Sequence, residues 1–76
     1  MKKTKGTLYY DLSSERMDIL YEDGTREGGL HCGETFEVKI GREWIPTRIE
    51  MSWNTDEWYL VGVKNVSNLE GLRVRL

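Results

Sequence analysis

"ETFEVKIGREWIPTRIEM", residues 34–51, decides the fold because it reads as one β-hairpin with a fixed register. Gly41-Arg42 fits a two-residue loop, since glycine at the first central position suits a type II′ turn. Counting outward from this turn places six apolar side chains on one face of the sheet: Phe36, Val38, Ile40, Ile45, Ile49 and Met51. A slip of one residue would turn the whole set toward water, so the turn and the hydrophobic pattern support the same register.

The opposite face of this hairpin is predicted to be exposed to solvent, and it includes one tryptophan. Its residues are Glu37, Lys39, Trp44, Pro46, Arg48 and Glu50. In the predicted register the missing N–H of Pro46 lies on the side away from residues 34–40, where a further strand would pair. We therefore expect the sheet to open or bulge at Pro46.

Further strands are predicted on both sides of the hairpin. Residues 6–12 and 16–21 alternate apolar and polar side chains around a polar turn, and their inner face holds Leu8, Tyr10, Leu12, Met17, Ile19 and Tyr21. Asp23-Gly24 suits a tight reversal of the chain after them. Residues 57–63 form the next strand, and two alternatives remain for its inner face. A loop of residues 52–56 turns Tyr59, Val61 and Val63 inward, whereas a four-residue loop between Trp53 and Trp58 turns Trp58 and Leu60 inward.

The C-terminal part predicts a short turn and one more strand. Ser67, Asn68 and Gly71 surround the turn, which fits one 3₁₀ turn. The last strand then places Leu72, Val74 and Leu76 inward and sends Arg73 and Arg75 to solvent. Five or six short antiparallel strands joined by sharp turns predict an all-β fold, a small barrel whose closure covers the sheet edges.

One domain is predicted over residues 6–76, preceded by a disordered basic tail at residues 1–5 that carries Lys2, Lys3 and Lys5. The formal net charge of −2, from 11 basic and 13 acidic residues, is too small to indicate a charged partner through long-range attraction. A single cysteine and a single histidine allow neither an internal disulfide nor a four-ligand zinc site, so we expect no cofactor. The unpaired thiol and the lack of a signal peptide or long apolar run predict a cytoplasmic protein without a membrane span.

Several stretches of this sequence follow the strand order of SH3-like barrels. These are "GETFEV", a tight turn, "EWIPTRIE", a polar loop, "WYLVG", the turn "SNLEG" and the strand "LRVRL". Three stretches, "GLHCGETFEV", "WIPTRIE" and "WYLVG", resemble a family of small uncharacterised proteins from Gram-positive bacteria, their phages and mobile elements. The resemblance covers about residues 8–76 and implies an SH3-like barrel without an assigned activity. The motifs that line the proline-binding groove of signalling SH3 domains are absent, so that mode of peptide binding is not expected.

His31-Cys32 is the most conspicuous reactive pair, yet we interpret it as a structural corner. Adjacent residues on an extended chain point to opposite faces, which makes them poor catalytic partners. The flanking Gly28, Gly29 and Gly33 suit a sharply bending chain, and Cys32 is expected to pack as a small apolar side chain. Redox sensitivity or metal binding shared between molecules is the alternative. No residue set meets the requirements for a general acid, base or nucleophile, so we do not expect an enzyme.

The tryptophans point to a binding role. Trp53 and Trp58 are expected in the core, because a small barrel needs their area. Trp44 is expected on the outer face beside Lys39, Pro46 and Arg48, unless the N-terminal strand covers it. The leading hypothesis is a non-enzymatic module that binds a protein partner near Trp44, Pro46 and Arg48, with help from Trp58.

Nucleic-acid binding is the alternative function, as an accessory protein of a phage or mobile element. Its contacts would be the lysine tail and four arginines, with an exposed aromatic ring stacking on a base: Arg42, Arg48, Arg73 and Arg75. The sequence leaves open a monomer or a weak homodimer that pairs an open edge near Pro46.

Overall fold

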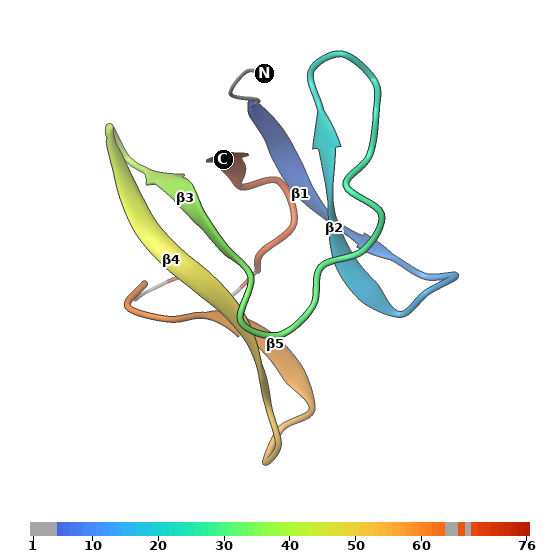
Figure 1. Cartoon of the computed structure of the whole chain (residues 1–76). Helices are drawn as coiled ribbons and strands as arrows, with labels where there is room; N and C mark the ends of the chain where they lie inside the picture. The colour runs from blue at the N-terminus through green and yellow to red at the C-terminus, as the bar shows by residue number, and fades with distance from the viewer. Residues whose placement is uncertain (1–4, 64–65, 67) are drawn as a thin grey trace.

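The computed structural model describes residues 5–63, 66 and 68–76. This part of the chain is all-β, as predicted, with the strands β1 Lys5–Asp11, β2 Arg16–Tyr21, β3 Thr35–Ile40, β4 Glu43–Ser52, β5 Glu57–Leu60 and β6 Arg73–Arg75. The strands form one antiparallel sheet in the order β2-β1-β6-β3-β4-β5 (Figure 1). Among these residues, no helix has the length and apolar character needed to cross a membrane.

The N-terminal boundary differs from the prediction. Lys5 is the first residue of β1 and pairs with Arg75, so it does not belong to a tail. Lys2 and Lys3 lie outside the described residues.

The β3–β4 hairpin has the predicted register. Lys39 pairs with Trp44, Val38 with Ile45 and Phe36 with Thr47. Gly41 has a φ of 64°, whereas Arg42 does not have a positive φ, which is the pattern of a type II′ turn. The predicted inner face is confirmed at five of its six positions: Phe36, Val38 and Ile49 are buried, and Ile40 and Ile45 pack partly buried against them. Met51, the sixth, is half-buried opposite Trp58 and lies outside the core cluster.

β6 completes the core from the middle of the sheet. Val74 is fully buried and pairs with Gly6 of β1 on one side and with Val38 of β3 on the other. Leu72 packs against the core, whereas Leu76 is exposed, so the predicted inward alternation of the last strand holds only in part. The turn that leads into β6 is a β-turn in which the Leu72 N–H donates to the Leu69 carbonyl and Gly71 has a φ of 91°. The suggested 3₁₀ turn is absent from the described residues, and Ser67 lies outside them.

The β1–β2 hairpin confirms the inner face at Leu8, Met17, Ile19 and Tyr21, whereas Tyr10 is exposed at the border of this face and the prediction for Leu12 is wrong. Leu12 is 81% exposed because β1 ends at Asp11 and the turn begins one residue earlier than the polar residues suggested. The Glu15 N–H donates to the Asp11 carbonyl and Glu15 takes a φ of 58°, which closes this turn.

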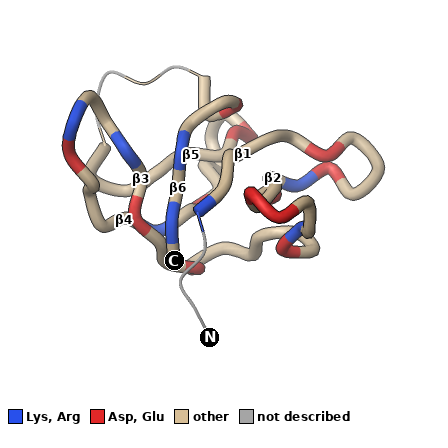
Figure 2. The backbone as a smooth tube through the Cα atoms, turned by 90° about the horizontal axis from the view of Figure 1, so that it is seen from above, with Lys and Arg blue, Asp and Glu red and all other residues tan. Residues whose placement is uncertain are grey.

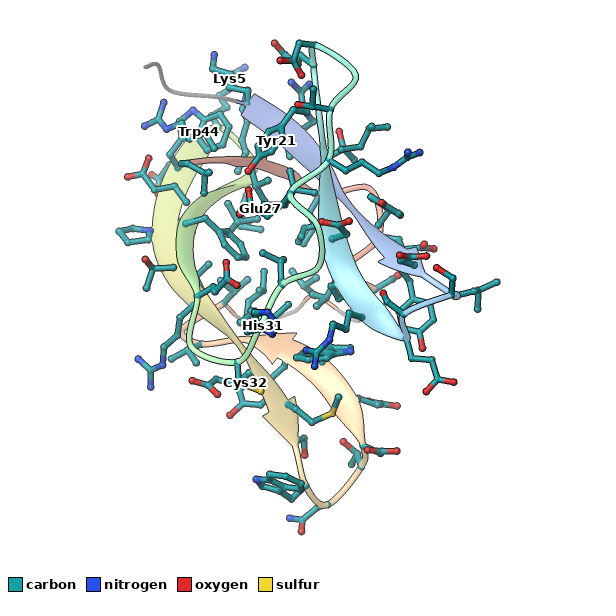
Figure 3. All side chains as sticks on the ribbon, turned by 45° about the vertical axis from the view of Figure 1, so that its right-hand side comes forward. Lys5, Tyr21, Glu27, His31, Cys32 and Trp44 are labelled. Atoms are coloured by element: carbon teal, nitrogen blue, oxygen red, sulfur yellow. The ribbon has the colours of Figure 1, made fainter. Side chains whose placement is uncertain are left out.

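The outer edge of β2 is covered by residues 25–30. The chain reverses at Asp23-Gly24 as predicted, and the Glu27 and Leu30 N–H groups then donate to the carbonyls of Ile19 and Met17. Leu30 is buried in the core. The Tyr21 hydroxyl donates to the Glu27 carboxylate, toward which it points in Figure 3. Burial and this carboxylate raise the pKa of the Tyr21 phenol, which keeps it a donor.

β4 is the long strand that connects two parts of the sheet. It pairs with β3 through residues 43–48 and with β5 through residues 49–52, so the sheet opens beside Pro46 as predicted. The β4–β5 loop consists of residues 53–56, because Ser52 pairs with Glu57. Trp58 and Leu60 therefore face inward and Tyr59 faces out, which is the inner face of the second predicted alternative. The four-residue loop of that alternative was expected one residue later, between Trp53 and Trp58.

The predicted barrel closure is absent from the described residues. β2 and β5 are the two ends of the strand order and do not pair with each other. Two features account for this: residues 25–30 occupy the outer edge of β2, and β5 has only four residues. The curved sheet consequently has one side open, between β5 and the β1–β2 hairpin.

Gly6 provides a test of how closely the strands pack. A Cβ atom at Gly6 would lie 2.6 Å from the Leu20 carbonyl oxygen and 2.7 Å from Cγ2 of Ile19. Gly6→Ala should therefore lower the free energy of unfolding by about 1–3 kcal/mol through overpacking, as measured by urea denaturation. Thr35→Ala, at an exposed position of β3, is the control and should change it by less than about 0.5 kcal/mol. An unchanged stability for Gly6→Ala would contradict this packing.

Candidate functional site

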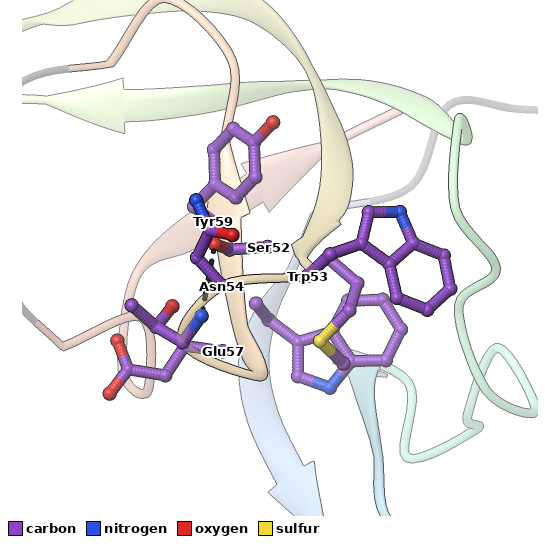
Figure 4. A pocket seen from close by; sticks show the side chains of 8 residues that line it. Ser52, Trp53, Asn54, Glu57 and Tyr59 are labelled. Carbon is purple, nitrogen blue, oxygen red and sulfur yellow. Dashed lines mark hydrogen bonds between the residues drawn. The ribbon is translucent and has the colours of Figure 1, made fainter.

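The open side of the sheet carries the most exposed tryptophan among the described residues. Trp53 lies in the β4–β5 turn with 93% of its surface exposed, so its prediction as a core residue is wrong. The reason is the loop, which begins at residue 53 and carries the indole beyond the end of the sheet. Figure 4 shows Trp53 and Tyr59 on different sides of this hairpin.

Trp58 connects the turn with the interior. Its ring packs partly buried against the core, as predicted. One hollow of about 570 Å³ runs around the turn and is lined by Met51, Trp53 and Trp58 among others. A second hollow of about 430 Å³ lies between β5 and the β1–β2 hairpin, where Trp58 meets Tyr10, Met17 and Leu69. Trp58 thus lies between two concave regions that have both polar and apolar linings.

Trp44 lies on the outer face, as predicted, but it is half-buried. The guanidinium of Arg75 lies 4.3 Å from the centroid of its ring, and the Lys39 ammonium lies 5.9 Å from it. Arg75 is held there by an ion pair of 2.5 Å with Glu37. The cover of the indole therefore includes a side chain of β6, the last strand, which neither predicted alternative included.

The structure does not bring all the predicted binding residues together. Lys39, Trp44, Pro46 and Arg48 belong to the outer face of the β3–β4 hairpin, where Pro46 and Arg48 are exposed. Trp58 projects from the inner face of β5. The predicted site is thus divided between two faces of the sheet.

The arginines of the nucleic-acid alternative lie beside acidic partners. Arg48 pairs with Glu50, Arg73 with Glu22 and Arg75 with Glu37, at distances of 3.0, 2.6 and 2.5 Å. Arg42 is exposed in the β3–β4 turn. Figure 2 shows basic residues along β6 with acidic residues on neighbouring segments. The positive charge of the outer face is therefore largely compensated locally.

Asp18 is a buried carboxylate that the strand pattern places among the wet residues. It is only 3% exposed because residues 26–30 fold over it. Its Oδ1 accepts hydrogen bonds from the N–H groups of Ile19, Gly28 and Gly29 at 2.8, 3.0 and 2.9 Å. Its Oδ2 accepts a hydrogen bond of 3.0 Å from the Tyr9 hydroxyl. The sequence signal for this arrangement is the Gly28-Gly29 pair, whose φ values of 103° and 102° aim two successive amides at one acceptor.

The surroundings of Asp18 give it a structural role. Its two oxygens accept four hydrogen bonds from donors in three segments of the chain, so it fastens residues 26–30 to the β1–β2 hairpin. The pKa of the Tyr9 phenol is raised mainly by burial and also by its hydrogen bond to the Asp18 carboxylate.

The His31-Cys32 corner is sharply bent, but its thiol is not packed. Gly33 has a φ of 91°, and its N–H donates to the Ile49 carbonyl at 2.8 Å. This bond anchors the corner to β4 and leaves the His31 and Cys32 side chains on the outside (Figure 3). The prediction that Cys32 packs as a buried apolar side chain is therefore wrong. Among the described residues, no three His, Cys, Asp or Glu side chains are grouped so that they could hold a metal ion.

Two comparisons with known proteins found a match. A family model described as a domain of unknown function, DUF5348, matches residues 6–76. The chain belongs to this family. A crystal structure of a protein from Ruminococcus gnavus, a Northeast Structural Genomics Consortium target, resembles this DUF5348 domain with a TM-score of 0.84 and 54% sequence identity. The match covers 95% of this chain and 99% of that one.

A search of the curated proteins found no match for this DUF5348 domain. The predicted relationship to a small uncharacterised family is thereby supported at the level of a domain of unknown function, and neither match names an SH3-like fold.

Removal of the buried Asp18 carboxylate is predicted to lower the stability of the DUF5348 domain strongly. Asp18→Ala removes the acceptor of four hydrogen bonds and should lower the free energy of unfolding by about 3 kcal/mol, because buried donors then lose their partner. Asp23→Ala is the matched control. The Asp23 carboxylate also accepts two hydrogen bonds, from Thr25, but it is exposed, so the change should be clearly smaller in the same urea titration. Equal losses for the two variants would show that burial of Asp18 adds nothing.

The exposed thiol predicts ready chemical modification. Cys32 in the folded domain should react with Ellman's reagent at a rate close to that of the unfolded chain, because its side chain is accessible to the reagent. A reaction that becomes fast only in denaturant would show a buried thiol instead.

Proposed function

We propose that this DUF5348 domain is a non-enzymatic module that binds a protein partner through its open side, with Trp53 and Trp58 as the main contacts. The observation that carries this proposal is Trp53, which is 93% exposed at the end of a hairpin. Tryptophan is enriched among the residues that dominate protein–protein binding, because its large rigid ring gains much from burial. In this position the ring contributes little to the core, which fits a role in contacts with another molecule.

The surroundings of Trp53 favour a protein as the partner. Met51 and Met17 line the adjoining hollows, and flexible thioether side chains adapt to varied apolar surfaces. Trp58 offers a second indole anchored in the core. The combination provides a rigid apolar centre with an adaptable border, which suits a docked side chain from a partner.

The outer face is the weaker candidate for the main contact. The Trp44 ring is already stacked beneath Arg75, so a partner there would have to replace an existing contact. The nucleic-acid alternative needs arginines that are free to meet phosphates, whereas three of its four predicted arginines form ion pairs. An SH3-like architecture, with which the strand order is consistent, and a cytoplasmic location, which suits an exposed thiol, both fit a binding role.

Affinity capture from a lysate of the native cell tests this proposal. Trp53→Ala should weaken the captured partner's binding at least about tenfold, as expected for an interface tryptophan. The same variant should change the free energy of unfolding by less than about 0.5 kcal/mol, because the side chain is exposed.

Trp44→Ala is the matched control and should retain the partner. Loss of the partner in Trp44→Ala but not in Trp53→Ala would instead place the site on the outer face. Failure of the wild-type domain to retain any partner would overturn the proposal.

A further inference from the structure

The free edge of β5 borders the open side and presents backbone groups to it. The Val61 N–H donates to the Arg48 carbonyl at 3.1 Å, so Arg48 and Val61 form a hydrogen-bonded pair. In an antiparallel ladder such pairs alternate, which directs the backbone groups of Glu57 and Tyr59 toward β4. The N–H and C=O of Trp58 then point away from β4. Outside β4, no described residue forms a backbone hydrogen bond with Trp58.

The other edge of the sheet differs in this respect. Residues 25–30 accept or donate backbone hydrogen bonds along β2 and bury Leu30. At β5, by contrast, Trp58 has no backbone hydrogen bond to a described residue outside β4, although Val63 and Leu69 lie nearby. Exposed edges of this kind are the sites at which proteins add a strand from a partner.

A groove runs along the β5 edge on the inner side. The hollow between β5 and the β1–β2 hairpin is lined by Tyr10, Met17, Trp58 and Leu69. A second hollow follows the same edge from Trp58 past Leu60 to Val63 and Leu69. Alternate side chains of an added strand would enter this groove, where Trp58 and Leu69 offer apolar contacts.

The rim of this groove is acidic, which favours the binding of a basic chain. Asp56, Glu57 and Glu70 line the hollow, whereas none of its lining residues is basic. Glu57 is exposed on the outer face of β5, beside the path of an added strand. The Glu70 carboxylate accepts a hydrogen bond of 2.9 Å from the Tyr10 N–H, which fixes a second negative charge across the groove. A chain with lysine or arginine at every second position would place those side chains beside Glu57, in the negative field of this rim.

A second copy of the domain would add no charge complementarity at this edge. Antiparallel pairing of two β5 strands in full register would place Glu57 of each copy opposite Leu60 of the other. Residues 56–60 contain no basic side chain that could pair with the acidic rim. The observed charges therefore favour a basic segment over self-association.

We infer that β5 binds an extended, basic segment of a partner protein as an added antiparallel strand. Its apolar residues enter the groove over Trp58 and Leu69, and its basic residues lie beside Glu57. This inference rests on the proposed function and specifies how the partner is recognised.

The test uses a synthetic peptide of alternating lysine and valine, measured by isothermal titration calorimetry at low salt. The peptide should bind the intact domain, and a peptide of alternating glutamate and valine should bind at least about tenfold more weakly. Glu57→Lys should weaken binding of the lysine peptide by a similar factor. Glu43→Lys, at an exposed position by the β3–β4 turn, is the matched control and should leave the affinity unchanged.

Backbone pairing gives a second readout. Methylation of the valine amides, which would face β5, should abolish binding, whereas methylation of the lysine amides should not. In hydrogen exchange followed by NMR, the Trp58 amide should become protected on binding, while the Tyr59 amide, already directed to β4, should not change. Equal affinity for the two methylated peptides, or no binding of the lysine peptide, would overturn strand addition.

These outcomes separate the two proposals. Capture of a partner that depends on Trp53, combined with no binding of the lysine peptide, would refute strand addition and leave the protein-binding role intact. Peptide binding that depends on Glu57, without any captured partner, would support the groove and refute Trp53 as its anchor.

Discussion

The structure depends on the insertion of β6 between β1 and β3. Val74 pairs with Gly6 on one side and Val38 on the other, and it is fully buried between them. Within the described residues, the β1–β2 hairpin has no strand pairing with β3, β4 or β5, so β6 is the strand that joins the two groups. Such distant pairing has a high entropic cost of loop closure, which the burial of Val74, Leu8 and Val38 must offset.

The part of the fold that local chemistry determines could be predicted from the sequence. Gly41-Arg42 fixes both the turn and the register, and the six apolar residues around it agree with that register. The β4–β5 loop contains no such turn signal, so the sequence allowed two loop lengths and two inner faces for β5. The four residues of this loop include Trp53, and only the structure shows that the indole lies outside. Leu12 and Cys32 were misplaced for a related reason, because hydrophobic character alone does not show where a strand ends.

The candidate site could be predicted only in part, because it is formed by segments far apart in the sequence. Trp58 was recognised, but its neighbours Tyr10, Met17 and Leu69 belong to other strands and turns. The burial of Asp18 also could not be predicted from its own strand. Its position in an alternating strand indicated a solvated carboxylate, and a separate segment with two glycines buries it. The sequence-based assignment of Trp44 to the outer face was correct, yet the arginine that covers it comes from β6.

The central position of β6 also constrains the order of events during synthesis. Residues 73–75 are made after the other five strands, and they must leave the ribosome exit tunnel before Val74 can reach Gly6 and Val38. Until then, β1 and β3 each expose an unpaired edge, through which nascent chains can aggregate. Because both edges pair with the same short strand, the nascent chain is expected to need protection by chaperones until residues 73–75 have left the exit tunnel.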